Sequence, residues 1–402
     1  MKKIVLDNGI RVIYKKIPGS MTSFCIGFEA GANSEDGFPE GTAHALEHMV
    51  FKGTGTRSEK KINEELDRIF AFNNAMTNYP YVIYYGSCSS EDFNEGFGLF
   101  SDIINNPVLK EEGFNEEINV ILQEAREWKE EFSQYCEDEI FLNSYKDKRI
   151  REIIIGNEES IGKISLKELK NFYRKHYTAE NCVITIISSM ELDDIIKILE
   201  TFRIQTGNYR RVEIPKEKNR KGIYRKEVRG FQGAKIQYIF DIQELNHKES
   251  EALKLYSMLL GEGVSSLLFE EIRNNKGYAY DISSEVVKEK GIEIFSINTS
   301  TSKEKIEDVL KSIGEVLDKS RKAVQDLKDG ELEVLKKRLI LKREFWLERS
   351  VELAKYITVN EIMFNGGIEC MNFKKTLNSI DNDFIYTTLM KVLQNPSIQI
   401  LC

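Results

Sequence analysis

Two of the chain's four histidines stand four residues apart, and a glutamate directly precedes the second of them. The segment reads His44-Ala-Leu-Glu47-His48, an H-x-x-E-H pattern. In an α-helix the positions i and i+4 lie on one face, so both imidazoles can bind the same ion. Glu47 would lie about 100° round the helix from His48, within reach of a zinc-bound water without binding the metal. The pattern predicts a hydrolytic zinc site with Glu47 as general base.

Two histidines on a helix can also be ordinary polar residues of a core or a surface. A chance match to three fixed positions is expected in about one chain in a hundred, because histidine is a rare residue. The flanking sequence is typical of a short helix: residues 31–41 form a loop rich in glycine and acidic residues, and Lys52-Gly53-Thr54-Gly55 follows. We therefore favour the metal site.

A hydrolytic zinc site needs three protein ligands and one open position. The best candidate for the third ligand is Glu124, in a segment where Ile118, Ile121 and their neighbours recur at helical spacing. Glu117 stands two helical turns earlier on the same face, where it could orient a histidine. From the residues alone this evidence is weak, because an acidic helix is more often a solvated face.

With these residues the chain resembles the pitrilysin/insulinase metallopeptidases, and among them the short bacterial members similar to mitochondrial processing peptidase. The likeness covers nearly the whole chain, beginning at Leu6-Asp7-Asn8-Gly9 and continuing through 41–54. In that family the third zinc ligand belongs to an E-x6-E pattern, at the spacing where this chain has Glu117 and Glu124. The resemblance implies one Zn²⁺ per chain, held by His44, His48 and Glu124, with Glu117 in support.

Two further segments resemble that family. Asn74-Ala75-Met76-Thr77 is similar to a strand whose backbone pairs with an extended peptide substrate. Arg273 and Tyr280 follow a glycine-rich loop and are similar to an R-x6-Y element, which the resemblance implies holds the substrate backbone and polarises the scissile carbonyl. Read without the resemblance, Arg273 would be an ordinary exposed arginine and Tyr280 a core tyrosine.

The chain departs from the family pattern at two points. Where relatives carry glycines just before the substrate strand, this chain has Phe70-Ala71-Phe72-Asn73. The arginine that follows the serine pair of the glycine-rich loop is replaced by Leu267. Both changes concern substrate preference rather than the chemistry.

Length and pattern predict two domains, because 402 residues exceed one ordinary core. The polar, basic run 205–222 lacks hydrophobic periodicity and is interpreted as a linker between a zinc-binding catalytic domain, 1–206, and a homologous domain, 223–402, with the Arg/Tyr element. The expected strands are 23–29, 182–188, 235–241 and 292–299, and the expected helices are 58–72, 92–105, 114–131, 190–202, 250–260, 265–274, 303–319 and 330–356. Their repeated order predicts an α+β fold of two homologous domains, each a mostly antiparallel sheet packed with helices.

The remaining features argue against other classes of protein. His176 is expected at the surface or in a cap and His247 in a polar loop, while the six cysteines form no C-x-x-C pair and are expected to be reduced. No apolar stretch approaches membrane-spanning length, and the first residues enter a strand directly, so a cytoplasmic location without membrane contact is predicted. A net charge of −8 disfavours a nucleic-acid partner.

The resemblance implies a zinc-dependent endopeptidase that hydrolyses unstructured peptides in an enclosed chamber. Because short members of the family supply two of the chamber's four domains, the chain is expected to form a homodimer or a heterodimer with a homologous subunit. Two alternatives stay open. One is a dedicated processing peptidase that removes leader peptides together with a partner subunit, and the other is a non-catalytic peptide-binding subunit, for which missing metal ligands would be expected.

Overall fold

A computed structural model describes residues 1–402, apart from the side chain of Asp329. The chain forms two compact units. Unit 1 comprises Met1–Arg126, Glu152–Ile214 and Phe345–Met371, and unit 2 comprises Glu127–Arg151, Pro215–Glu344 and Asn372–Cys402. Unit 1 therefore includes a segment that follows the predicted linker, Phe345–Met371, and unit 2 includes a segment that precedes it, Glu127–Arg151. The division into domains 1–206 and 223–402 stays a prediction about the two halves of the sequence.

Unit 1 is built on a six-stranded sheet in the order β1-β2-β6-β3-β5-β4. Its strands are β1 (Lys2–Val5), β2 (Arg11–Lys16), β3 (Met21–Phe28), β4 (Phe70–Thr77), β5 (Val82–Ser89) and β6 (Cys182–Ser188). Only β2 and β6 pair in parallel, and the other neighbours are antiparallel. The strand β4 lies at the end of the sheet, so one of its edges has no strand partner in unit 1.

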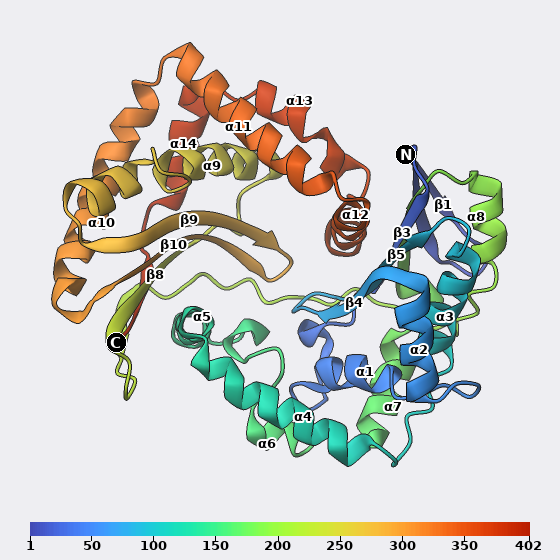
Figure 1. The fold of residues 1–402 in the computed structure, drawn as a ribbon. Helices are drawn as coiled ribbons and strands as arrows, with labels where there is room; N and C mark the ends of the chain where they lie inside the picture. The colour runs from blue at the N-terminus through green and yellow to red at the C-terminus, as the bar shows by residue number, and fades with distance from the viewer. The chain divides into compact units, whose positions relative to one another are not determined.

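Helices cover both faces of this sheet (Figure 1). The helices of unit 1 are α1 (Thr42–Val50), α2 (Glu59–Ile69), α3 (Phe93–Asn105), α4 (Phe114–Glu127), α6 (Glu158–Ile161), α7 (Leu166–His176), α8 (Leu192–Leu199) and α12 (Ser350–Phe364). On the α3 face, Phe24 of β3 packs edge-on against Phe97 and Phe100. On the opposite face, α12 lies so close to β3 that a Cβ at Gly27 would come within 2.8 Å of Thr358. The helix α12 thus completes the core of unit 1.

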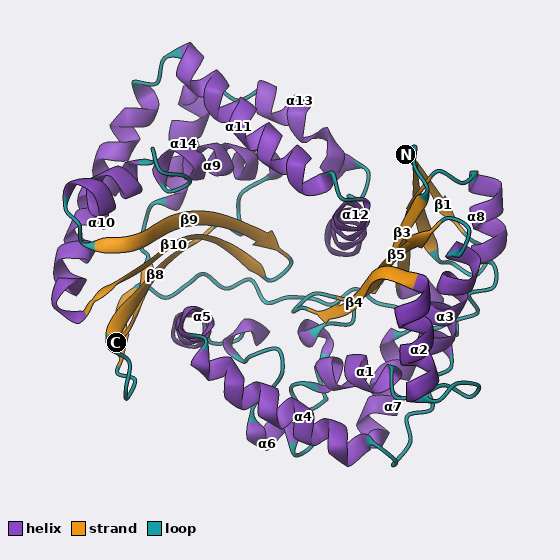
Figure 2. Ribbon diagram, viewed as in Figure 1, coloured by secondary structure: helices purple, strands orange, loops and turns teal.

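Unit 2 contains a five-stranded sheet in the order β7-β11-β8-β10-β9, in which only β7 and β11 pair in parallel. Its strands are β7 (Gly222–Lys226), β8 (Gly233–Asp241), β9 (Ala279–Glu289), β10 (Ile292–Ser302) and β11 (Ser397–Leu401). Its helices are α5 (Phe132–Ser144), α9 (His247–Leu260), a π-helix (Phe269–Asn275), α10 (Ile306–Gln325), α11 (Asp329–Leu347), α13 (Phe373–Asn378) and α14 (Asn382–Val392). The helix α5 covers one face of the sheet, and α9 and α14 lie on the other (Figure 2).

The two sheets share one topology. In unit 1 the strands β2 to β6 are arranged 2-6-3-5-4, and in unit 2 the strands β7 to β11 repeat that order, including the parallel pair. The predicted α+β class with mostly antiparallel sheets is confirmed. Among the described residues, no helix combines the length and the apolar character needed to cross a membrane.

Several local predictions are wrong. The helix expected over 58–72 ends at Ile69, because Phe70 begins β4 and packs against Phe100 in the core. The helix expected over 330–356 is two helices, because the chain is extended at Arg349 where it passes from unit 2 to the sheet of unit 1. His176, expected at the surface or in a cap, is the last residue of α7, and its imidazole is buried against Phe172 with 4.5 Å between ring centroids. His247, expected in a polar loop, begins α9.

Candidate metal centre

The helix α1, which carries the H-x-x-E-H pattern, is held at its first turn by Glu35. One carboxylate oxygen of this buried residue accepts hydrogen bonds from the backbone N–H of Gly41 at 3.0 Å and of Ala43 at 2.8 Å. A negative charge at a helix N-terminus complements the helix dipole and satisfies N–H groups that have no partner within the helix. Leu46 and Val50 are fully buried, so the polar face of α1 is fixed in direction.

Gly41 itself is required by the backbone at the start of α1. Its φ of +92° lies in the left-handed region, and an added Cβ would stand 2.1 Å from the carbonyl oxygen of Ile155. We expect Gly41→Ala to lower the free energy of unfolding by at least about 2 kcal/mol, because strain in φ and a backbone clash combine. Chemical denaturation measures this. Gly37→Ala is the matched control, since Gly37 also has positive φ but no atom within 4 Å of the added Cβ, and an equal loss in both variants would contradict the clash.

His44, His48 and Glu124 come together as a group of potential metal ligands whose ligand atoms all lie within 4.8 Å of one another. The two Nε2 atoms of the histidines are 3.3 Å apart, and Glu124 Oε2 lies 3.9 Å from His44 Nε2 and 3.8 Å from His48 Nε2. Two nitrogens bound to one tetrahedral zinc ion are separated by about 3.3 Å, given Zn–N bonds near 2.05 Å. The donor set therefore fits zinc.

The environment keeps His44 in the protonation state that a ligand needs. Burial, with a smaller contribution from His48, lowers the pKa of His44 to about 3, so its imidazole is neutral at physiological pH. A neutral imidazole offers a lone pair to a metal, whereas imidazolium does not. The Nδ1 atom of His44 is buried without a hydrogen-bond partner among the residues that the structure describes.

Glu117 contacts the second ring nitrogen of His48, and Lys52 in turn contacts Glu117. Its Nδ1 atom lies 2.7 Å from Glu117 Oε1, and the other oxygen of Glu117 lies 2.5 Å from Lys52 Nζ. The hydrogen bond to His48 lowers the pKa of Glu117 against the effect of burial. Burial lowers the pKa of His48, but the Glu117 carboxylate and nearby acidic groups outweigh it, so the pKa is raised overall. A carboxylate on the second ring nitrogen fixes the orientation of a ligating histidine.

Lys52 is a contact that the sequence analysis did not assign, although it stands one turn after His48. Its Nζ atom also donates to Glu59 at 2.9 Å, so the lysine is held from two sides. We expect Lys52→Met to weaken zinc binding about tenfold, because Glu117 would lose the cation that anchors it. Titration with a competing chelator measures this. Lys52→Arg should restore most of the affinity, and equal affinity in Lys52→Met and the parent chain would contradict the role.

Glu47, the remaining member of the pattern on α1, contacts the edge strand of the sheet. The hydroxyl of Thr77, the last residue of β4, donates to Glu47 Oε2 at 2.6 Å. Burial raises the pKa of Glu47, and the hydrogen bond from Thr77 opposes this rise. The predicted segment Asn74–Thr77 is a strand, as expected, and lies at the unpaired edge of the sheet. The structure thus places a carboxylate and an open strand edge on the side of α1 that carries the potential metal ligands.

Arg273 and Tyr280 lie in unit 2. Arg273 belongs to the π-helix and its guanidinium carbon stands 4.6 Å from the ring centroid of Tyr280 and 4.5 Å from that of Phe269. The alternative that Tyr280 is a core residue is wrong, because 80% of its surface is exposed. The guanidinium of the half-buried Arg273 therefore lies over the ring of the exposed Tyr280.

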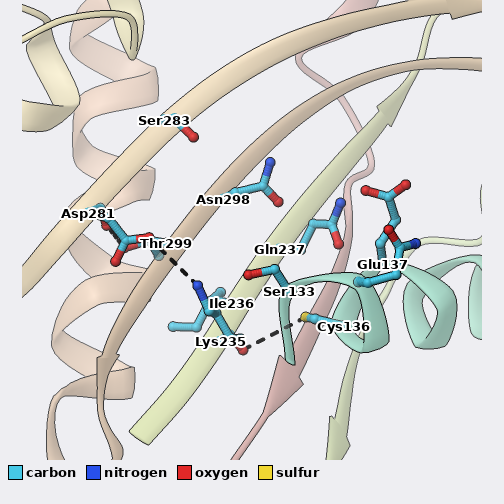
Figure 3. A pocket seen from close by; sticks show the side chains of 11 residues that line it. Ser133, Cys136, Glu137, Lys235, Ile236, Gln237, Asp281, Ser283, Asn298 and Thr299 are labelled. Carbon is cyan, nitrogen blue, oxygen red and sulfur yellow. Dashed lines mark hydrogen bonds and ion pairs between the residues drawn. The ribbon is translucent and has the colours of Figure 1, made fainter. Parts of the chain in front are cut away.

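A separate polar pocket lies in unit 2 between α5 and the sheet (Figure 3). Figure 3 shows Asp281, Asn298 and Gln237 on neighbouring strands, with Glu137 of α5 beside them. Burial, followed by the neighbouring Asp138, raises the pKa of Glu137 to about 7. The pocket contains no histidine, and the metal-ligand group is not part of it.

Comparison with known proteins places these residues in a family. Residues 11–158 match the family described as "Insulinase (Peptidase family M16)", and residues 163–339 match "Peptidase M16 inactive domain". The chain carries the domains of the M16 peptidase family. All three potential metal ligands lie in the first matched region, and the Arg273/Tyr280 pair lies in the second. The resemblance inferred from the motifs is confirmed at the level of the family.

Some relatives match nearly the whole chain, and others match about half of it. A Rickettsia felis protein named "Uncharacterized zinc protease" is 26% identical over 401 residues, covering 97% of this chain and 94% of the relative. The "Mitochondrial-processing peptidase subunit beta" of Caenorhabditis elegans is 30% identical over 197 residues, covering 49% of this chain and 43% of that protein. The crystal structure of a protease from Helicobacter pylori has a TM-score of 0.89 at 19% identity, covers 100% of this chain and 98% of its own, and supports the fold.

Proposed function

We propose that this chain is a zinc-dependent endopeptidase that hydrolyses unstructured peptides. The observation that carries the proposal is the 3.3 Å approach of His44 Nε2 to His48 Nε2, beside the carboxylate of Glu124. His44, His48 and Glu124 would hold one Zn²⁺, and Glu117 would support His48. When bound, zinc would polarise the scissile carbonyl and lower the pKa of water in the site.

The residues of the chain would carry out the proton transfers. Glu47 would accept the proton of the attacking water and deliver it to the leaving amine, as a general base that then acts as a general acid. Its hydrogen bond from Thr77 holds one carboxylate oxygen at the end of β4. Arg273 and Tyr280, from this chain or from a second copy, would donate to the carbonyl oxygen as negative charge develops on it, each contributing about 3 kcal/mol.

The unpaired edge of β4 indicates the class of substrate. A peptide that pairs with Asn74–Thr77 must offer an extended backbone with free N–H and C=O groups, which folded proteins rarely do. The proposed enzyme would therefore act on unstructured peptides, in the cytoplasm, as a homodimer or with a homologous subunit that completes the chamber.

A dedicated leader-processing peptidase is the second candidate. The segment Phe70–Asn73, next to the proposed substrate strand, favours it because Phe72 leaves 39% of its surface exposed there. An exposed aromatic residue beside a binding edge can select one peptide among many. A non-catalytic peptide-binding subunit is disfavoured by the complete set of proposed ligands and base.

The test is cleavage of a mixed pool of unstructured peptides by the purified chain, with its metal content measured in parallel. We expect about one zinc per chain and broad cleavage that a zinc chelator stops and added zinc restores. A zinc-loaded chain that cleaves no peptide in the pool would favour the processing peptidase. A chain that binds no zinc would overturn the proposed function.

A further inference from the structure

The start of β4 carries an aromatic side chain on the face of the sheet that α12 covers. A β-bulge lies between Phe70 and Phe72, so Phe70 points into the α3 core while Phe72 pairs with Ser87 of β5. Ser87 Oγ lies 2.6 Å from Ser23 Oγ, which in turn lies 2.7 Å from Ser350 Oγ at the first turn of α12. Ser350, Ser23, Ser87 and Phe72 therefore define one row across the sheet that ends at its open edge.

Two cations lie over aromatic rings in or beside this row. The guanidinium carbon of Arg349 stands 5.9 Å from the ring centroid of Phe72, and Lys355 Nζ stands 4.6 Å from that of Tyr85. Phe72 and Tyr85 are themselves neighbours, with 6.0 Å between ring centroids. Lys355 is paired with Glu352 at 3.1 Å, whereas no described carboxylate pairs with Arg349. The unpaired positive charge at this edge therefore belongs to Arg349.

A strand added at the edge of β4 would continue this row. Residues directly opposite in neighbouring strands have Cβ atoms about 5 Å apart on the same face. The peptide residue opposite Phe72 would thus point to the α12 face, next to the phenyl ring and the guanidinium. A guanidinium that lies against an aromatic ring keeps N–H groups free at its edge, and these match a carboxylate in geometry and charge.

Resting on the proposed function, we propose that Arg349 and Phe72 form a subsite for an acidic side chain of the peptide substrate. Thr77, which contacts the proposed base Glu47, stands five residues along β4 from Phe72. At about 3.3 Å per residue, the acidic residue would lie about five positions from the bond that is cleaved. The subsite gives a chain with a net charge of −8 a local preference for acidic peptides.

The test uses pairs of otherwise identical unstructured peptides that carry one Glu or one Gln, moved along the positions on each side of a single cleavable bond. We expect the Glu peptide to bind about fivefold more tightly than the Gln peptide at one position about five residues away, which is the size of a favourable exposed ion pair. Binding is measured by fluorescence anisotropy on zinc-loaded Glu47→Gln, so it needs no turnover. With the parent enzyme, the preference should appear in KM rather than kcat, because the contact is remote from the reacting bond.

Substitutions at one position distinguish this subsite from general charge effects. Arg349→Gln should abolish the preference, and Arg349→Glu should reverse it towards a Lys peptide. Lys60→Gln, which removes an exposed cation of α2 in the same unit, should retain it. Equal binding of Glu and Gln peptides at every position would overturn the subsite while leaving peptide hydrolysis intact. Preferential binding without any turnover by the parent enzyme would support the subsite and count against a general endopeptidase.

Discussion

Glu47→Gln is expected to lower kcat by between about 100- and 10,000-fold while zinc stays bound, which is the contribution usual for a general base. The amide keeps the size of the side chain and can still accept the hydrogen bond from Thr77, but it cannot take a proton. Glu47 is half-buried and is not one of the three grouped ligands, so zinc content should equal that of the parent chain. Peptide hydrolysis and metal analysis on the same preparation measure both quantities.

Glu64→Gln on α2 provides the control for the loss of one negative charge in unit 1. Its side chain is 54% exposed and takes part only in long contacts with neighbouring lysines of its own helix, so activity should be retained. Loss of zinc from Glu47→Gln would contradict the assignment of Glu47 as base, because it would make this carboxylate a ligand. Full activity in Glu47→Gln would exclude it from proton transfer.

Glu124→Ala is expected to weaken zinc binding more than about 100-fold, and peptide hydrolysis should fall with it. Removal of a residue that only supports a ligand usually costs 10- to 100-fold, and removal of a ligand should cost more. The side chain of Glu124 is 40% exposed, so its truncation leaves little buried space and the fold should survive. Competition with a chromogenic chelator measures the affinity.

The matched control is Glu116→Ala, which removes an exposed carboxylate from the same helix. Thermal unfolding with and without zinc supplies a second readout, because a ligand that binds only the folded state raises the melting temperature. Zinc should stabilise the parent chain and Glu116→Ala but not Glu124→Ala. Equal stabilisation of all three would show that the metal binds elsewhere.

The candidate site could be predicted from the sequence to the extent that it is local. His44 and His48 share one helix, and helical spacing alone places their imidazoles together. Glu124 comes from a distant helix, so helical periodicity made it only a weak candidate, and the resemblance to a family turned it into an assignment. Lys52 was missed because its partner, Glu117, is far away in sequence, although the i+4 spacing from His48 pointed to the correct face.

The fold could be predicted in class but not in the path of the chain. Hydrophobic alternation identified β3, β6, β8 and β10, because each buries one or both faces. It did not reveal that α11 ends at Leu347, since the break lies where buried side chains change from the core of one unit to the core of the other. Periodicity reports that a face is buried, but it does not say against which sheet.

The packing of α12 on the sheet of unit 1 affects how the chain folds during its synthesis. This helix covers β3 and β6, and Thr358 Oγ1 lies 2.7 Å from Thr185 Oγ1 in the middle of that face. The last strand of the sheet, β6, ends at Ser188, whereas α12 begins at Ser350. A ribosome needs on the order of ten seconds to add the intervening roughly 160 residues, during which one apolar face of the nascent sheet lacks its cover. Newly made chains should therefore depend on chaperones until α12 emerges, and prematurely terminated chains should aggregate.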